Sequence, residues 1–232
     1  MKTKAPVVNI ENQNWLRIPI KTRLILRGDN LIEAIQEGLI NAEQKPQNND
    51  ILFISEKAVG GSQGRYFVLG EDELKVRPMA RLLSKFVTRT PAGIGLGMPE
   101  TMECAMRECG SFRIMCAAFF GGFTRLFGRR GDFYRIAGSC ARSIDGPTSK
   151  TIPPFNNAVS LAPLDPYGVS ASIAEKFNCK VAVVDINDLG GNILGCFPLD
   201  IDKQMLVKIL KDNPLGQGRA QTPVGIIRKV TS

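Results

Sequence analysis

The chain has 232 residues, 44% of them apolar and 22% charged, which is enough to bury a substantial core as one large domain or two small ones. It contains no histidine, so Ser-His-Asp catalysis, Cys-His catalysis and histidine-bound zinc are excluded, and acid–base chemistry is left to Asp, Glu, Lys, Tyr or Cys. The formal net charge of +8 favours anionic partners such as nucleotides, phosphorylated metabolites, acidic peptides or nucleic acid.

The first residues are polar, and an apolar stretch follows them. Residues 1–14 are expected to be a polar lead-in to a domain formed by residues 15–232. Residues 15–26 predict one or two strands. Pro19 confines this region to an edge or a bulge, because proline cannot donate a ladder hydrogen bond.

A helix and a strand are predicted next. An amphipathic helix is predicted over residues 30–43, because Leu31, Ile35 and Leu39 recur at four-residue intervals and share one face. Asp29 or Asn30 is its expected cap. A strand is expected to begin at Asp50 and to continue to about Val59, where Gly60 opens a glycine-rich break.

The middle of the chain is expected to hold helices, a hairpin and a turn-rich join. Helices are predicted over 78–87 and 99–108, separated by a flexible loop at 91–98. Residues 112–120 and 131–137 resemble the strands of a hairpin. Residues 145–166 hold five prolines and would join two subdomains, if the domain is divided.

The C-terminal part alternates helices and strands. Its predicted elements are a helix over 169–177, strands over 180–186 and 193–197, a helix capped by Asp202 and ended by Asn213-Pro214, and a closing strand over 223–230. Helices and strands are mixed without a strict βαβ rhythm. The pattern therefore predicts an α+β fold with mixed β-sheets and flanking helices.

The cysteines and the apolar runs indicate a reducing, aqueous location. Six cysteines are present and no pair forms C-x-x-C, so buried reduced thiols are expected. The N-terminus shows no signal-peptide apolar region, and the longest apolar run, residues 114–123, is too short to span a bilayer. We therefore expect a cytoplasmic protein without a membrane partner.

Arginines interleaved with aromatic residues form the densest basic cluster: Arg125, Arg129, Arg130 and Arg135 with Phe127, Phe133 and Tyr134. A nucleic-acid-binding face is one interpretation of this pattern. Solvated hairpin ends are the other, and the absence of an RNA-binding signature favours them.

Two glycine-rich segments invite a phosphate-binding interpretation. Gly93-x-Gly95-x-Gly97 is not a P-loop and follows no clear strand, so an ordinary loop is the better interpretation. The second segment follows the predicted strand at 50–59, where Lys57 and the glycines after it could present a charge and backbone N–H groups to phosphate. A plain strand–turn–strand accounts for it equally well.

Carboxylate and amide side chains lie beside glycines on three separate segments: Asp145 before Gly146, Asn187 and Asp188 before Gly190, and Gln217 between Gly216 and Gly218. Taken singly, such residues are common in turns. Hard divalent cations prefer oxygen ligands, so a fold that gathers these side chains would bind one or two such ions. The pattern indicates nucleotide-dependent chemistry without a P-loop.

Four segments, in order and nearly along the whole chain, resemble the coenzyme F420-0:L-glutamate ligase family, the gamma-glutamyl ligases of deazaflavin cofactor biosynthesis. They are Ile18-Pro19-Ile20-Lys21 with Gly28-Asp29-Asn30-Leu31, Asp50 to Lys57 with Gly64-Arg65, Leu164-Asp165-Pro166 with Val181 to Gly190, and Gly216-Gln217-Gly218 with Pro223 to Arg228. The resemblance implies that family's fold and an intertwined homodimer.

The resemblance also implies GTP-dependent ligation. A carboxylate of the acceptor, which would be the deazaflavin F420-0 or another small carboxylate, would be activated as an acyl phosphate, and L-glutamate would attack it. Mg²⁺ or Mn²⁺ would neutralise charge on the transferred phosphoryl group. No catalytic side chain is assigned.

Ligand residues follow by position from the resemblance. The metal ligands would be Asp145, Asn187, Asp188 and Gln217. The nucleotide would be bound by Ile18, Pro19, Ile20, Lys21, Glu56, Lys57, Thr148, Leu215, Gly216, Gln217 and Gly218.

Two departures from the family leave other functions open. Gly61 stands where the family has a second lysine, and Asn187 stands where it has a metal-binding aspartate. The alternative to an active ligase is therefore a catalytically degenerate binding protein of the same fold. A basic nucleic-acid-binding protein is the second alternative.

Overall fold

The computed structural model describes residues 5–87, 95–129, 131–149, 151–187, 190–216 and 220–230. The chain divides into two compact units, which we describe separately. Unit 1 comprises Met1–Gly64 and Pro163–Ser232, and unit 2 comprises Arg65–Ala162. Within the described residues, no helix is long and apolar enough to cross a membrane.

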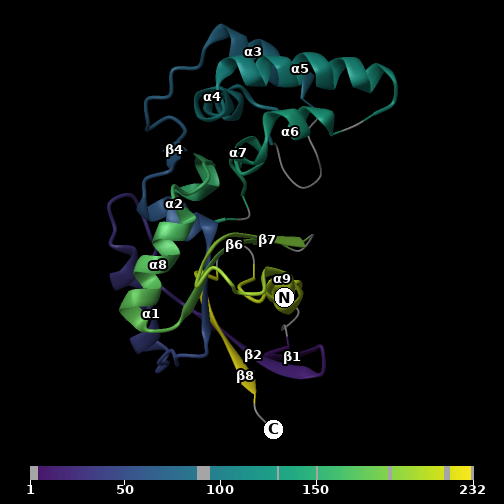
Figure 1. Ribbon diagram of the computed structural model, residues 1–232. Coiled ribbons are helices and arrows are strands. Elements are labelled where there is room, and N and C mark those ends of the chain that lie inside the picture. The colour runs from purple at the N-terminus through teal and green to yellow at the C-terminus, as the bar shows by residue number, and fades with distance from the viewer. Residues whose placement is uncertain are drawn as a thin grey trace. The chain divides into compact units, whose positions relative to one another are not determined.

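Unit 1 is built on a six-stranded mixed sheet in the order β1-β2-β8-β3-β6-β7 (Figure 1). Its strands are β1 Val7–Ile10, β2 Gln13–Ile20, β3 Ile51–Ser55, β6 Lys180–Asn187, β7 Gly190–Phe197 and β8 Val224–Val230. β3 and β6 are parallel, and every other neighbouring pair is antiparallel. The α+β class with a mixed sheet and flanking helices is confirmed.

Both faces of this sheet are covered, because alternate residues of a strand point to opposite sides. On one face, Leu52 and Ile54 of β3 pack in a core with residues of α1 Leu31–Asn41, α2 Glu56–Ser62 and α8 Pro166–Phe177. On the other face, Phe53 packs with residues of α9 Lys203–Leu210. Figure 1 shows α1, α2 and α8 on one side of the strands and α9 on the other.

Several predicted elements of unit 1 are confirmed together with their caps. Asn30 Oδ1 accepts hydrogen bonds from the backbone N–H groups of Ile32 and Glu33, at 3.1 and 3.3 Å, and so caps α1. Asp202 Oδ1 accepts from Met205 N at 2.9 Å and caps α9. α8 and the strands β6, β7 and β8 overlap the segments predicted for them, although α8 and β7 each begin three residues earlier than predicted.

Two expectations for the start of the chain need revision. Residues 1–14 were expected to be a lead-in, but they contain β1 and the start of β2, which pair with each other. Along β1, exposed and half-buried residues alternate, as in a paired strand. The strand that was expected to run from Asp50 to Val59 ends at Ser55, so that prediction was wrong over its second half. There the Ser55 hydroxyl accepts from Ala58 N at 3.3 Å and starts α2, a serine cap that competes with strand continuation.

Unit 2 is mainly helical, with a small two-stranded sheet. Its elements are β4 Tyr66–Val68, α3 Pro78–Leu83, the 3₁₀ turn Ser84–Phe86, α4 Pro99–Glu108, α5 Ser111–Leu126, α6 Asp132–Ala137, α7 Ser139–Arg142, the 3₁₀ turn Phe155–Asn157 and β5 Ala158–Ser160. β4 and β5 pair antiparallel. Fully buried side chains such as Met102 of α4 and Ile114 of α5 form its core.

The hairpin predicted over 112–120 and 131–137 was wrong, because both segments are helices that pack against each other. The apolar run over residues 112–120 did not show a helical pattern, because its apolar residues are not confined to one face of the helix. Ile114 and Ala117 are buried three positions apart, whereas Phe119 is 70% exposed. The run also holds Met115 and Ala118, which favour helix over strand.

Candidate functional site

Three strands of unit 1 bring their carboxyl ends to one edge of the sheet. β3 and β6 are parallel, and β2 and β3 both run antiparallel to β8, so β2, β3 and β6 point the same way. β8 starts at the same edge, because Val224 pairs with both Ile20 and Ile54. We call this the carboxyl edge. The carboxyl ends of neighbouring strands are a common place for a binding site in sheets of this kind.

The end of β2 contributes Ile18, Pro19, Ile20 and Lys21 to the carboxyl edge. Ile20 is fully buried in the core, so its side chain anchors the strand. Pro19 and Lys21 are exposed. Thr22 then donates its backbone N–H to Gln221 O at 3.0 Å, which ties the end of β2 to the segment before β8. Lys21 is thereby held at the edge.

The end of β3 contributes Glu56 and Lys57. Ser55 N donates to Pro223 O at 2.8 Å, so β3 is also tied to the segment before β8. Glu56 is 8% exposed, whereas Lys57 is exposed on the first turn of α2. The glycine loop that was expected to follow Lys57 is part of this helix, so the interpretation of its backbone as a phosphate cradle was wrong.

The segment before β8 contributes Leu215 and Gly216. Asn213 holds this turn from both sides: its carbonyl accepts from Gly216 N at 2.9 Å, and its side-chain Nδ2 donates to Gly216 O at 3.0 Å. The hydroxyl of Thr222 donates to Leu215 O at 2.6 Å. The predicted residues Gln217 and Gly218 lie outside the described residues.

The end of β6 places Asn187 at the same edge. Ser55 pairs with Val184, and β6 continues for three residues beyond that point, paired with β7 up to Asn187 and Gly190. The hairpin of β6 and β7 therefore extends past the end of β3. Asp188, the predicted neighbour of Asn187 in a metal site, lies outside the described residues.

Asp145 and Thr148 belong to unit 2 and are described there. Asp145 forms an isolated bridge with Ser160, the last residue of β5: its N donates to Ser160 O at 3.0 Å, and its O accepts from Ser160 N at 2.9 Å. These two bonds fix the backbone and leave the Asp145 side chain exposed. Thr148 is exposed, and its carbonyl accepts from Thr151 N at 3.3 Å.

The predicted donor set suits a hard divalent cation. Asp145 and Asp188 supply carboxylate oxygens, and Asn187 and Gln217 supply amide oxygens, which are the ligands that Mg²⁺ and Mn²⁺ prefer. In the part of the chain that the structure describes, no three Asp, Glu, Cys or His side chains are grouped as a metal site. The ligand set therefore stays a prediction.

A charged turn follows Lys21 in the connection from β2 to α1. Asp29 Oδ2 accepts from Leu26 N at 2.7 Å, and its Oδ1 lies 2.8 Å from the Arg23 guanidinium. The backbone hydrogen bond from Leu26, and then the hydrogen bond from Arg23, hold the pKa of Asp29 below its usual value. This turn leads into Gly28-Asp29-Asn30-Leu31, one of the segments that carry the family resemblance.

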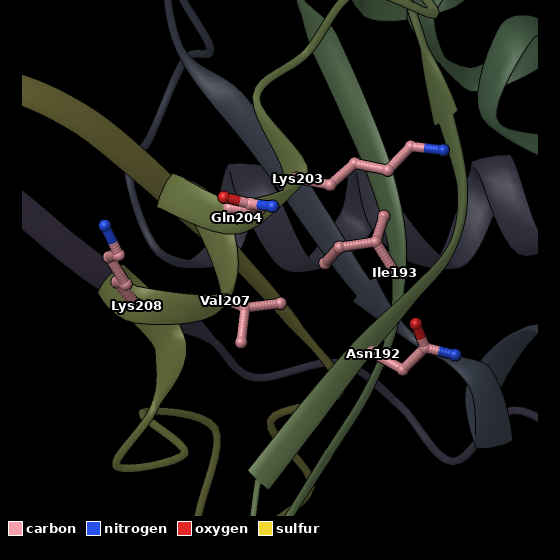
Figure 2. A pocket seen from close by; sticks show the side chains of 6 residues that line it. All are labelled: Asn192, Ile193, Lys203, Gln204, Val207 and Lys208. Atoms are coloured by element: carbon pink, nitrogen blue, oxygen red, sulfur yellow. The ribbon is translucent and has the colours of Figure 1, made fainter.

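The structure also shows two cavities in unit 1 that no motif indicated. One, of about 450 Å³, lies between β7 and α9 and is lined by Asn192, Ile193, Lys203, Gln204, Val207 and Lys208 (Figure 2). Lys203 Nζ lies 3.0 Å from Tyr167 Oη, and this hydrogen bond raises the pKa of Lys203. The other, of about 660 Å³, lies where α8 ends and β6 begins, away from the carboxyl edge. Neither contains a sequence-predicted site residue.

The residues that sequence reasoning missed at the carboxyl edge are those that fasten its strands. They are Thr22, Ser55, Asn213, Thr222 and Pro223. Ser55 had a recognisable signal, since serine before a run that can form a helix is a common N-cap. Thr22 and Pro223 act through backbone groups whose partners are distant in sequence, which no local pattern reveals. Asn213 and Thr222 bind nearby carbonyls through their side chains, those of Gly216 and Leu215.

Comparisons with known proteins agree with the resemblance noted above. The chain is 38% identical over 60 residues to an uncharacterized protein of Methanocaldococcus jannaschii. That alignment covers 26% of this chain and 19% of the relative, so the chain matches about a fifth of the relative's length. The family model described as F420-0:Gamma-glutamyl ligase matches residues 19–195, which is well over half of the chain. The chain therefore belongs to the F420-0:gamma-glutamyl ligase family.

Proposed function

We propose that the protein is a nucleotide- and divalent-metal-dependent amide ligase that adds L-glutamate in gamma-linkage to F420-0, or to a related carboxylate acceptor, with GTP as the co-substrate. One observation supports this beyond family membership. The described parts of the three segments of unit 1 that the resemblance assigns to the nucleotide, residues 18–21, 56–57 and 215–216, all belong to the carboxyl edge of one sheet.

The reaction balances without histidine. An acceptor carboxylate oxygen would attack the γ-phosphorus of GTP, which forms an acyl phosphate and releases GDP. The glutamate amine would then attack the acyl carbon, form the amide and release phosphate. Lys21 and Lys57, both exposed at the carboxyl edge, would attract the polyphosphate. A bound Mg²⁺ or Mn²⁺ would neutralise charge on the transferred phosphoryl group.

The departures from the family make a degenerate binding protein the second candidate. Gly61 is buried within α2, where the family has a lysine, so Lys57 is the cation that α2 offers to a phosphate. Asn187 keeps a side-chain oxygen but lacks the charge of aspartate. A protein with these changes could retain a nucleotide without transferring its phosphate.

We further propose that the protein acts as a homodimer, as the family resemblance implies. α5 carries a stripe of exposed apolar side chains that a second copy would cover: Phe112, Met115, Phe119 and Phe123, continued by Phe127 at its cap. Contiguous exposed apolar surface of this kind marks protein–protein contact sites.

Calorimetric titration of GTP, GDP and ATP into the full-length protein, with and without Mg²⁺ or Mn²⁺, tests the nucleotide assignment. We expect metal-dependent binding of a guanine nucleotide. Lys57→Ala should weaken this binding, whereas Lys229→Ala, an exposed lysine near the far end of β8, should not. Absence of binding for all three nucleotides would refute the proposal. Binding without GDP release in the presence of F420-0 and glutamate would favour the degenerate binding protein.

A further inference from the structure

The groove between β7 and α9 in unit 1 has an apolar floor. Its volume, about 450 Å³, lies within the range of small-molecule sites. Ile193 of β7 is 7% exposed and Val207 of α9 is half-buried, and both pack in the core that α9 covers. Figure 2 shows their side chains directed toward each other. The floor of the groove is therefore continuous with the core.

Three polar side chains line the groove beside this floor. Lys203 and Gln204 come from the first turn of α9, and Asn192 precedes Ile193 on β7. The cap formed by Asp202 holds this turn in the helical conformation, so the positions of the first two side chains follow from the backbone. One ammonium and two amide groups thus lie next to an apolar surface, and all three can donate hydrogen bonds.

The charge of Lys203 is held in place without being neutralised. Its Nζ donates to Tyr167 Oη at 3.0 Å and lies 5.2 Å from the centre of the Tyr167 ring. Among the residues that the structure describes, no carboxylate forms an ion pair with Lys203. The Tyr167 hydroxyl accepts from Lys203 and keeps its own hydrogen to donate. An anion at this end of the groove would meet two donors.

The second lysine of the groove differs from Lys203. Lys208 Nζ lies 2.7 Å from Glu11 Oε1, so its charge is already matched by a carboxylate. Figure 2 shows the Lys208 side chain directed away from Ile193. The groove therefore offers one uncompensated positive charge. This suits a ligand with a single negative charge better than a polyphosphate, whose further charges would stay unpaired.

We propose that this groove binds a small monocarboxylate with an apolar body. The carboxylate would accept hydrogen bonds from the Lys203 ammonium and the Tyr167 hydroxyl, and the apolar body would cover Ile193 and Val207. The charge-assisted hydrogen bond would fix the orientation, while burial of apolar surface adds affinity. None of the lining residues belongs to the segments assigned to the nucleotide or the metal, so the proposal depends on neither assignment.

Sodium benzoate is a suitable probe, because it combines one carboxylate with a compact apolar ring. NMR of the full chain, labelled at its isoleucine and valine methyl groups, would report binding at Ile193 and Val207. We expect benzoate to shift both methyl resonances saturably, with a Kd on the order of 1 mM for a ligand of this size. Benzamide, its neutral isostere, should bind about tenfold more weakly, because it lacks the charge. Inorganic phosphate should cause no saturable shift.

Variants of Lys203 test the role of the charge. Lys203→Met, which keeps an apolar stem, should weaken benzoate binding about tenfold, whereas Lys203→Arg should retain it within about threefold. Lys211→Met, which replaces an exposed lysine at the C-terminal cap of α9, is the control and should bind as the wild type does. Unchanged affinity in Lys203→Met, equal affinities for benzamide and benzoate, or no saturable shift up to about 20 mM benzoate would each overturn the proposal. Tighter binding of phosphate than of benzoate would overturn it as well, because the groove would then select charge alone.

Discussion

Arg228 of β8 and Asp50, the residue before β3, form a two-pronged ion pair at the end of the sheet opposite to the carboxyl edge. Arg228 Nε lies 3.0 Å from Asp50 Oδ1, and its Nη2 lies 2.7 Å from Oδ2. Asp50 is only 2% exposed, and its carboxylate also accepts from Gln47 N at 2.9 Å. Truncation of a buried partner leaves the other charge uncompensated, so Asp50→Ala should lower the free energy of unfolding by about 3–5 kcal/mol.

Urea denaturation measures this loss. Lys45→Ala serves as a control on the same turn and should change the free energy of unfolding by less than about 0.5 kcal/mol. Because the ion pair lies away from the carboxyl edge, Asp50→Ala should retain nucleotide affinity while it remains folded. Loss of affinity in the folded variant would contradict this separation of roles.

Adjacent glycines of α5 should respond to alanine with opposite signs. An added Cβ at Gly121 would lie 2.9–3.0 Å from Phe133, including its backbone, so Gly121→Ala should destabilise the protein by about 1–3 kcal/mol through overpacking of α5 against α6. An added Cβ at Gly122 meets nothing within 4 Å. Gly122→Ala should therefore stabilise the helix by about 0.5–1 kcal/mol. Equal effects in thermal melts would refute the packing of α5 on α6.

Glu103 gives unit 2 an acid-sensitive contact. Burial alone would raise its pKa, but hydrogen bonds from Arg77 and Arg107, at 3.0 and 2.8 Å, outweigh that effect and lower the pKa. With the folded pKa below the unfolded one, this stabilisation is present above about pH 4.3, the usual value for glutamate, and is lost as the pH falls through the folded pKa.

Glu103→Gln should therefore lower the free energy of unfolding by about 1–3 kcal/mol at pH 7 and by less at pH 3. Denaturation at both pH values measures the difference. Glu100→Gln, on the first turn of the same helix, is the matched control and should show a smaller dependence on pH. A Glu103→Gln deficit that is as large at pH 3 as at pH 7 would exclude the ionic contribution.

Asp188 supplies the predicted metal carboxylate next to Asn187. If this assignment holds, Asp188→Ala should abolish metal-dependent nucleotide binding, because the amide of Asn187 brings no charge to the cation. Titration of Mg²⁺ or Mn²⁺ with GTP measures the effect. Asp200→Ala, an exposed aspartate between β7 and α9, is the control that should bind as the wild type does. Unchanged binding by Asp188→Ala would show that the metal assignment is wrong.

The exposed stripe of α5 offers a test of the proposed homodimer. Phe119→Asp should place a charge at its centre and shift the protein to monomer, measured by light scattering across a concentration series. Thr124→Asp on the same helix lies off the stripe and should leave the oligomeric state unchanged. A wild-type protein that is monomeric at high concentration would disprove the dimer.

Local signals in the sequence predicted the elements with side-chain caps and strong periodicity. Asn30 and Asp202 cap their helices as expected, and β6 follows from a continuous apolar run. α5 was misread because Gly110 provides no side-chain cap and its phenylalanines are exposed. α5 carries apolar residues on its exposed face as well as on its buried face, so it lacks the single apolar stripe by which an amphipathic core helix is recognised.

The candidate site was predictable as a set of residues but not as a place. The resemblance named Lys21, Lys57 and Leu215 from their local motifs. Their common edge depends on the directions of β2, β3 and β8, and β2 pairs with β8 across some two hundred residues of sequence, as in the pair Ile20 and Val224. No local pattern fixes a pairing over that separation, because it is decided by which strands bury one another's faces.

Pro19 protects the side of β2 that faces away from β8, beyond Leu16, the last residue of β2 that β1 pairs. Arg17 N donates to Pro6 O, so the N–H groups at alternate positions of β2 point away from β8, and the ring nitrogen of Pro19 faces that same side. A strand from another molecule that docked there would find no donor at Pro19. Sheet edges with a full row of donors recruit foreign strands and aggregate. Pro19, which the resemblance assigns to nucleotide binding, would thus also help to keep β2 from pairing with a strand of another molecule.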